Sequence, residues 1–192
     1  MTFPDVMVDI ETTGTRPDRA AVIQLSAVRF CLKTRQIDTA NMFDAALSMP
    51  AWRSWDEDTR RWWRQQNPAV LNNILTKMRP PPQVMAEFIT WANQDGLDSY
   101  NRFFWAKNAS FDSQFIASYC TDFELPNPFH YRSVRDMRTF ILGRSHPEGL
   151  PDVEETKTDQ AHNSLVDCIT QIDWLFKAYD AVEVNRAPNQ IG

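Results

Sequence analysis

The sequence predicts an α/β fold in which a mixed central β-sheet lies between layers of helices. Two observations support this prediction. Short apolar segments typical of strands, at 5–11, 20–30 and 102–107, alternate with longer segments of helical periodicity. The chain has 192 residues, 43% of them hydrophobic, so it can bury a substantial core. We expect one domain over 1–184 and a C-terminal tail over 185–192.

The first part of the chain is rich in β-structure. Residues 5–11 are expected as an apolar strand, and Gly14 and Pro17 give the stretch after it the composition of a turn. A second strand, rich in valine and isoleucine, is expected at 20–30, and a third after Ile37. This hairpin-like start, followed by helices, indicates a mixed sheet rather than a purely parallel one.

Three helices are expected next. The first covers 54–66, where Ser54 and Glu57 have the spacing of a capping box. The second covers 69–78, and three consecutive prolines end it. The third covers 83–94, where apolar residues recur at helical spacing.

The second half of the chain continues the alternation. A helix at 110–120 follows the strand at 102–107, with Ser110 as its expected N-cap. The remaining segments are expected as a loop at 121–129, a helix at 135–142 that ends near Gly143, a loop at 144–160 and a last helix at 161–181.

Two acidic residues stand at the end of the first strand. Asp9 and Glu11 are separated by one residue, and alternate side chains of a strand point to the same face. Like charges in a buried position repel each other unless a positive charge neutralises them. Either the strand has already ended and both carboxylates lie in solvent, or the pair holds a cation.

Three further residues can likewise be explained either by an ordinary structural role or by a role in a functional site. Asp112 lies in the first turn of a helix, where the helix dipole alone can account for an acid. Asp167 falls off the apolar stripe of the last helix, as a solvated acid would. His162, five residues earlier, is by itself an ordinary residue for the start of a helix. The ordered combination of D-x-E, F-D and H-x4-D is what favours a functional site.

This ordered set resembles the DEDDh exonucleases, a family of the ribonuclease-H-like superfamily. Asp9 and Glu11 match the first motif of the family, Asp112 the second, and His162 with Asp167 the third. The resemblance extends over roughly residues 5–180 and implies a ribonuclease-H-like three-layer fold. The stretch "DEDTRRWWRQQ" also resembles one branch, which contains phage and prophage enzymes of the exonuclease VIII type and bacterial exoribonucleases.

The resemblance implies a 3′–5′ exonuclease that hydrolyses single-stranded ends of DNA or RNA to nucleoside 5′-monophosphates. It also implies that four carboxylates, with Asp9 bridging, hold two metal ions. Because carboxylate oxygens are hard ligands, Mg²⁺ or Mn²⁺ is favoured over zinc. His162 is the expected general base, since imidazole ordinarily titrates near neutrality. The expected metal ligands are Asp9, Glu11, Asp112 and Asp167.

Substrate contacts are expected at two places. Thr12 and Thr13 follow the first motif, and the resemblance implies that their backbone N–H groups meet the terminal nucleotide. The helix at 54–66 interleaves tryptophan and arginine, a combination that stacks on bases and binds phosphates. Packing of that helix on the sheet is the simpler explanation for Trp62, whereas Trp63 and Arg64 stay candidates for substrate binding.

Composition limits the remaining function classes. The formal net charge of −5 opposes nucleic-acid binding through bulk charge, although metal-binding acids contribute to that count. The three cysteines are widely spaced and predict neither a disulfide framework nor a zinc site. Without a signal peptide or a long apolar run, the protein is expected in the cytoplasm, with no membrane partner.

Two other functions are compatible with the same fold. One is a proofreading exonuclease associated with a polymerase, which shares the first motif. The other is a non-catalytic module that binds nucleic acid, although such a module has no need for a complete set of repelling acids. DNA or RNA 3′ ends are the expected partners in the leading interpretation, and a homodimer is a weaker expectation from the resemblance.

Overall fold

The computed structural model describes residues 2–145 and 162–185, and a mixed β-sheet forms its centre. The strands are β1 (Asp5–Thr12), β2 (Val22–Cys31), β3 (Gln36–Ile37), β4 (Phe43–Ala46), β5 (Phe103–Ala106) and β6 (Val134–Asp136). The sheet has the order β3-β2-β1-β5-β6, and β4 pairs with β2. β2 runs antiparallel to β1, β3 and β4, whereas β5 is parallel to both β1 and β6.

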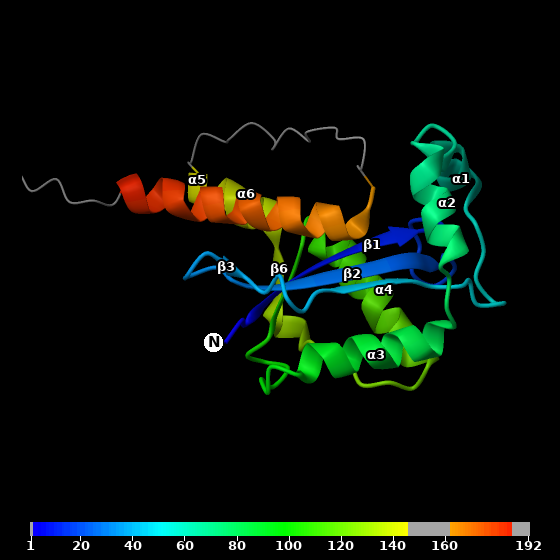
Figure 1. Ribbon diagram of the computed structural model, residues 1–192, viewed down its shortest axis with the longest axis horizontal. Helices are drawn as coiled ribbons and strands as arrows, with labels where there is room; N and C mark the ends of the chain where they lie inside the picture. Colours follow the sequence, from blue (N-terminus) through cyan, green and yellow to red (C-terminus); the bar gives the residue numbers. More distant parts are fainter. Residues whose placement is uncertain (1, 146–161, 186–192) are drawn as a thin grey trace, which may run out of the picture.

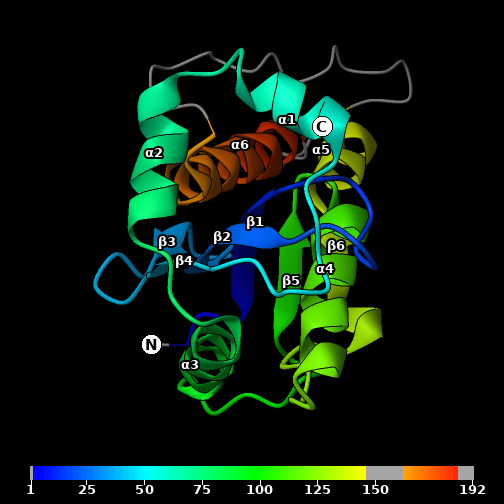
Figure 2. The same cartoon turned by 90° about the vertical axis from the view of Figure 1, so that its right-hand side faces the viewer.

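Helices cover both faces of this sheet. Figures 1 and 2 show α3 and α4 on one face, α5 and α6 on the other, and α1 and α2 near the end toward which β1 runs. This arrangement confirms the predicted α/β fold with helical layers on a mixed sheet. The bounds are α1 (Glu57–Trp63), α2 (Pro68–Thr76), α3 (Pro81–Asn93), α4 (Ala109–Asp122), α5 (Met137–Ser145) and α6 (Ser164–Asn185).

The alternation of side chains along β1 decides where its acids point. Val8 and Ile10 pack into the apolar cluster beneath α3 and α4. Met7 packs into the cluster on the opposite face, with residues of α5 and α6. Because side chains alternate, Asp9 and Glu11 share the face of Met7 and project toward α6.

The sequence prediction missed strand β6. We expected a helix from 135, but Val134–Asp136 is extended and pairs in parallel with β5. The helix α5 begins only at Met137, and it continues through Gly143 to Ser145 instead of ending near that glycine. A three-residue strand has too little pattern of its own, because it is extended only by virtue of its partner strand. The third strand also differs, since β3 ends at Ile37 and β4 begins at Phe43.

Two helix caps also differ from the prediction. The N-cap of α1 is Asp56, whose carboxylate accepts hydrogen bonds from two backbone N–H groups of the first turn, so the expected box from Ser54 is not formed. Helix α4 begins one residue earlier than expected, with Asn108 instead of Ser110 at the N-cap position. At the start of α6, Asn163 Oδ1 accepts from the first backbone N–H groups.

Some expectations lie outside the described residues. These are most of the loop predicted at 144–160 and nearly all of the tail predicted at 185–192. Among the helices of the described part, none has the length and apolar character that crossing a membrane requires.

Candidate active site

A cavity of about 1020 Å³ lies at the edge where β1 and β5 end. The two strands are parallel, so their carboxyl ends meet at this edge, and α4 begins there directly after β5. The cavity brings together all five residues that the sequence motifs single out. The motif residues in its walls are Asp9, Glu11, Asp112, His162 and Asp167.

Each acid reaches the cavity from a different direction. Asp9 and Glu11 come from β1, and Glu11 is only 8% exposed. Asp112 comes from the first turn of α4 and is 6% exposed, while a backbone hydrogen bond from Ile10 joins it to β1. Asp167 comes from the first turn of α6 and is half-buried. Three segments that are far apart in the sequence therefore contribute carboxylates to one place.

Buried polar contacts fix the start of α6 against the sheet. The hydroxyl groups of Ser164 and Ser26 lie 2.6 Å apart, and Ser164 is fully buried. One turn later the thiol of Cys168 lies 3.7 Å from the carbonyl oxygen of Met7. These contacts place the first turns of α6 directly over β1 and β2, so Asp167 faces the acids of β1.

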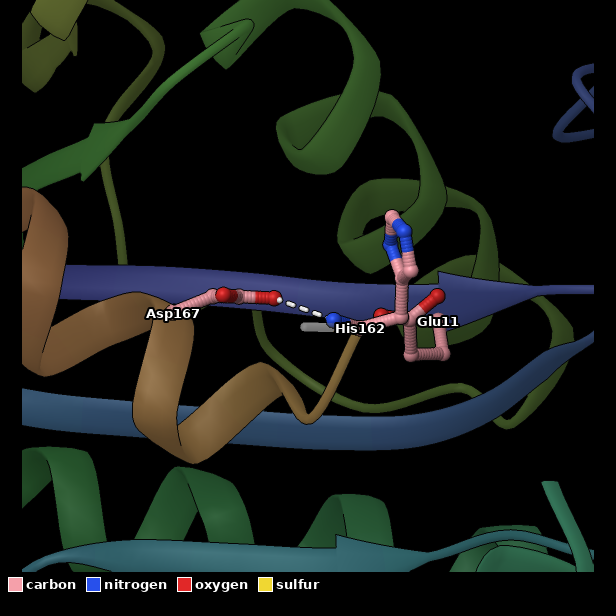
Figure 3. A group of neighbouring side chains, drawn as sticks. All are labelled: Glu11, His162 and Asp167. Atoms are coloured by element: carbon pink, nitrogen blue, oxygen red, sulfur yellow. Dashed lines mark hydrogen bonds between the residues drawn. The ribbon is translucent and has the colours of Figure 1, made fainter. Parts of the chain in front are cut away.

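His162 immediately precedes this helix. Its backbone N–H donates a hydrogen bond of 3.2 Å to Asp167 Oδ2, as Figure 3 shows. Its φ of 69° lies in the left-handed region, which a residue other than glycine adopts only when its surroundings hold it there. The imidazole packs edge-on against Trp62, with ring centroids 4.6 Å apart. A ring nitrogen lies within 4.8 Å of carboxylate oxygens of Glu11 and Asp167.

The acids destabilise one another's charged forms. Burial, and next the charge of Asp167, raises the pKa of Asp9 to about 7. Burial also raises the pKa of Glu11, with further contributions from the other three acids. The pKa of Asp112 is raised by burial and then by Asp9. Such a cluster is unfavourable in its ionised form, so a cation at this place would stabilise it.

The donor set fits hard divalent cations. Glu11, His162 and Asp167 each offer a ligand atom within 4.8 Å of the other two, and Asp9 and Asp112 add carboxylates to the same cavity. Mg²⁺ and Mn²⁺ prefer such oxygen ligands, whereas structural zinc sites rely more on cysteine and histidine. The residues present therefore suit the group that the motifs imply.

Two polar residues beside Asp9 also line the cavity and were not predicted from the sequence. Gln171 is 4% exposed, and its Nε2 donates to Asp9 Oδ1 over 2.8 Å. Its Oε1 is buried and has no hydrogen-bond partner among the described residues. Lys107, at the end of β5, also lines the cavity, and its charge lowers the pKa of Asp9. The signal for Gln171 was available, because it lies four residues after Asp167 and hence on the same helical face.

The two threonines after the first motif hold the chain in place. Thr12 lines the cavity, and its hydroxyl donates to the carbonyl oxygen of Gly14. Thr13 is fully buried, and its backbone N–H donates to the carbonyl oxygen of Ala21 over 2.8 Å. That bond occupies the N–H that we expected to meet substrate. We therefore assign Thr13 to the support of the site and keep only Thr12 as a candidate contact.

Helix α1 lies very close to the end of β1. The backbone N–H of Asp56 donates to the carbonyl oxygen of Thr13 over 2.8 Å. A Cβ atom at Gly14 would lie 2.8 Å from Asp56 Cβ and 3.0 Å from Ala20 Cβ, so only glycine fits without rearrangement. This close approach makes α1 one wall of the cavity.

The tryptophans of α1 are arranged differently from the prediction. Trp63 is 3% exposed, and its indole N–H donates to the carbonyl oxygen of Thr12, so it packs the helix against the sheet. Trp62, which we expected to pack, is 38% exposed and lines the cavity beside His162. Arg64 does not line this cavity but an adjacent one.

Comparison with known families agrees with the geometry. The model of the 3′-5′ exoribonuclease Rv2179c-like domain matches residues 4–178. The chain belongs to this family. The description of this family, a 3′-5′ exoribonuclease domain, agrees with the kind of enzyme that the sequence motifs predict. The phage branch receives no support, and among curated proteins no significant match is found.

Solved structures show the same fold as this Rv2179c-like domain. Cell-death related nuclease 4 (CRN-4) is 17% identical with a TM-score of 0.68, over 92% of this chain and 64% of that one. The nuclease domain of 3′hExo, a DEDDh family member bound to rAMP, is 12% identical with a TM-score of 0.64, over 94% and 93%. A zinc-bound complex of Escherichia coli ExoI with single-stranded DNA is 12% identical with a TM-score of 0.68, over 95% and 43%. The chain thus spans less than two thirds of CRN-4 and of ExoI.

Proposed function

We propose that the chain is a metal-dependent 3′–5′ exonuclease that hydrolyses single-stranded nucleic acid ends to nucleoside 5′-monophosphates. The observation that carries this proposal is the convergence of four carboxylates and His162 in one cavity. Residues 1–184 would act as a single exonuclease domain, which the family match over 4–178 supports.

The four acids would serve as the metal ligands. Two Mg²⁺ or Mn²⁺ ions would neutralise the carboxylates, stabilise the charge that develops on the phosphodiester and lower the pKa of the attacking water. Asp9 suits a bridging position, because its charge interacts with those of Asp167, Glu11 and Asp112. Gln171 would hold the Asp9 carboxylate in place through its amide N–H.

His162 would remove the proton from the attacking water. Its ring nitrogen is close to the oxygens of Glu11 and Asp167, between which a water that those carboxylates orient would lie. Two contacts fix the direction of the imidazole, namely the backbone hydrogen bond to Asp167 and the edge-on packing against Trp62. A general base held in this way contributes about 10²–10⁴-fold to turnover.

Aromatic side chains in the walls would hold the terminal base. Trp62, Phe111 and Trp174 line the cavity, and Lys107 offers a cation for a phosphate. The similar structures include one bound to rAMP and one with single-stranded DNA, so neither sugar is disfavoured by them. The description of the family names exoribonucleases, so RNA is the first substrate to test.

The decisive experiment uses single-stranded RNA and DNA oligomers labelled at the 5′ end. Each is incubated with the protein and Mg²⁺, Mn²⁺ or EDTA, and the products are separated by size. We expect a ladder of products that shortens from the 3′ end and the release of mononucleotides, only with metal. Binding without cleavage under all three conditions would support the non-catalytic module instead.

Two further expectations can be tested in parallel. Selective removal of mismatched 3′ ends from a primer–template would favour the proofreading alternative. Light scattering on the eluting protein would show whether it forms the homodimer that the family resemblance implies.

A further inference from the structure

A second cavity opens beside the first, between α1 and α2. It has a volume of about 440 Å³, and ligand sites in proteins commonly have about 300–1,000 Å³. Gln66 lines both cavities. Trp62 borders the first and Trp63 the second, and their rings are 5.1 Å apart. The two cavities are therefore direct neighbours that share a wall.

The second cavity combines apolar walls with two cations. Trp55, Trp63 and Leu71 supply the apolar surface. Arg60 of α1 and Arg64, the C-cap of that helix, lie about one helical turn apart and both line the cavity. An aromatic surface beside guanidinium groups suits a flat, partly apolar group that carries a negative charge, because bases stack on tryptophan and phosphates pair with arginine.

The charges of the two arginines are only partly balanced. Both face the single carboxylate of Glu57, at 3.7 Å for Arg60 and 3.9 Å for Arg64, beyond ordinary hydrogen-bond distance. Their side chains are 47% and 67% exposed. Arg61, on a different face of the helix, is paired with Asp58 at 3.3 Å and does not line the cavity. A local positive charge thus lies beside the acidic site of a chain whose net charge is −5.

We propose that this second cavity binds a nucleotide of the substrate strand upstream of the bond that is cleaved. The base would lie against Trp55 and Leu71, and its phosphate would meet Arg60 and Arg64. The proposal rests on the proposed function, because the shared wall at Gln66 connects the cavity to the place where the 3′ end is cleaved. It follows that oligomers long enough to reach the second cavity bind more tightly than a dinucleotide.

Binding without turnover provides the first test. Fluorescein-labelled rU8 and dT8 are titrated with the full chain in EDTA, and anisotropy is recorded at several salt concentrations. We expect the double variant Arg60→Gln/Arg64→Gln to bind about 5–20-fold more weakly, because two phosphate contacts are lost. The slope of log K against log salt should become less steep by about 0.7 for each lost contact. Arg61→Gln, matched in charge and helix, should bind as the wild type does.

A second variant separates a true site from general attraction by charge. Asn72→Trp would fill the cavity from the exposed side of α2 without changing any charge. We expect it to weaken binding of the octamers by a similar factor. If the arginine variants weaken binding but Asn72→Trp does not, or if Arg61→Gln has an equal effect, the arginines act by long-range attraction and the proposed nucleotide site is refuted.

Cleavage assays then distinguish failure of this inference from failure of the proposed function. With Mg²⁺ or Mn²⁺, the double variant should raise KM for the octamers with little change in kcat, and the effect should shrink for a dinucleotide. Normal cleavage together with unchanged KM and unchanged octamer binding would refute the second site alone. Absence of metal-dependent cleavage in the wild type, with the pattern of binding intact, would refute the proposed function and leave the second cavity as a nucleotide site of a binding protein that does not cleave.

Discussion

Buried carboxylates occur at both ends of the central sheet, but their surroundings differ, because at one end a buried arginine pairs with one of them. Near the start of β5, Asp95 accepts two hydrogen bonds from the guanidinium of Arg102, at 2.7 Å and 3.2 Å. Both side chains of this pair are almost completely buried. At the other end of the strands, Asp9, Glu11 and Asp112 line one cavity, and Asp9 raises the pKa of both Glu11 and Asp112.

The two groups of acids differ in the source of their neutralising charge. The guanidinium of Arg102 is neutralised within the chain and also donates to the carbonyl oxygens of Leu97 and Pro128. Removal of either partner of such a pair leaves an uncompensated buried charge. The acids at the end of β1 are held by a glutamine amide and backbone N–H groups, which do not neutralise their charge. A bound cation would neutralise it. The buried pair of Arg102 and Asp95 stabilises the fold. The acids at the end of β1 are unfavourable without a cation, as expected of a binding site.

Among the variants, Asp9→Asn should lower the cleavage rate most. Loss of this carboxylate, a proposed metal ligand, should reduce cleavage on the order of 10³-fold or more, because the proposed metal pair could no longer assemble. The metal-free protein should nevertheless become more stable by roughly 2 kcal/mol near pH 8, since one repelling charge is removed. Initial cleavage rates and urea unfolding in EDTA measure the two effects.

Asp95→Asn is the matched control at the other end of the sheet. Here the same chemical change should lower the free energy of unfolding by about 3–5 kcal/mol, because the buried Arg102 loses its counter-charge. The cleavage rate of the folded fraction should be retained. If both substitutions change stability in the same direction, the contrast between the two ends is wrong.

His162→Ala should have the next largest effect on activity. We expect kcat to fall about 10²–10³-fold while the metal concentration needed for half-maximal activity changes little. At saturating metal, the acidic limb of the pH–rate profile should become less steep, because one of the groups that must be deprotonated is gone. His130→Ala, which removes an imidazole stacked on Tyr100 far from the cavity lining, serves as the control and should keep both kcat and the pH profile.

The same contrast separates what the sequence could predict from what it could not. The strand period was sufficient to put Asp9 and Glu11 on one face, whereas Asp167 was singled out only by the H-x4-D pattern that it forms with His162 in the ordered set of motifs. Strand β6 depends on its pairing of Val134 with Phe104, which no local pattern encodes. Features that depend on neighbours in the sequence, such as the face on which a strand residue lies, were therefore predictable. Features that depend on a distant partner, such as the pairing of β6 with β5, were not.

Helix α1 shows most clearly how contacts with a distant segment limit prediction from the sequence. Its first turn is capped by Asp56, and Trp63 rather than Trp62 is buried, because the end of β1 approaches it closely at Gly14. The choice between two adjacent tryptophans depends on the rotation of the helix relative to the sheet. Helical periodicity alone predicts that one face is buried but does not determine which residue meets the strand end.

The stability of the metal-free protein should fall as the pH rises from about 4 to about 7. The pKa of Asp9 is raised from 3.8 to about 7, so between these values the folded state binds more protons than the unfolded state. Its contribution to stability is therefore complete below about pH 4 and is lost as the pH rises to about 7, amounting to roughly 2–4 kcal/mol. The difference between wild type and Asp9→Asn in thermal unfolding with EDTA isolates it. Added Mg²⁺ should oppose this trend, because it binds the deprotonated acids of the wild type. A pH-independent difference in EDTA would contradict the burial of this charge.

A more modest effect is expected from the loss of a single hydrogen bond, the one between Gln171 and Asp9. Gln171 lies against Asp9 much as Arg102 lies against Asp95, but it carries no charge, so it can orient the carboxylate without competing with a cation. Gln171→Leu should lower the affinity for Mn²⁺ and the cleavage rate about tenfold, since partners of metal ligands typically contribute 10–100-fold. Stability should stay equal or rise, because the unpartnered Oε1 no longer has to be buried. A Mn²⁺ titration of activity measures the metal affinity, and urea unfolding measures the stability. A loss of stability with unchanged metal affinity would assign Gln171 to the packing of α6 instead of to the orientation of Asp9.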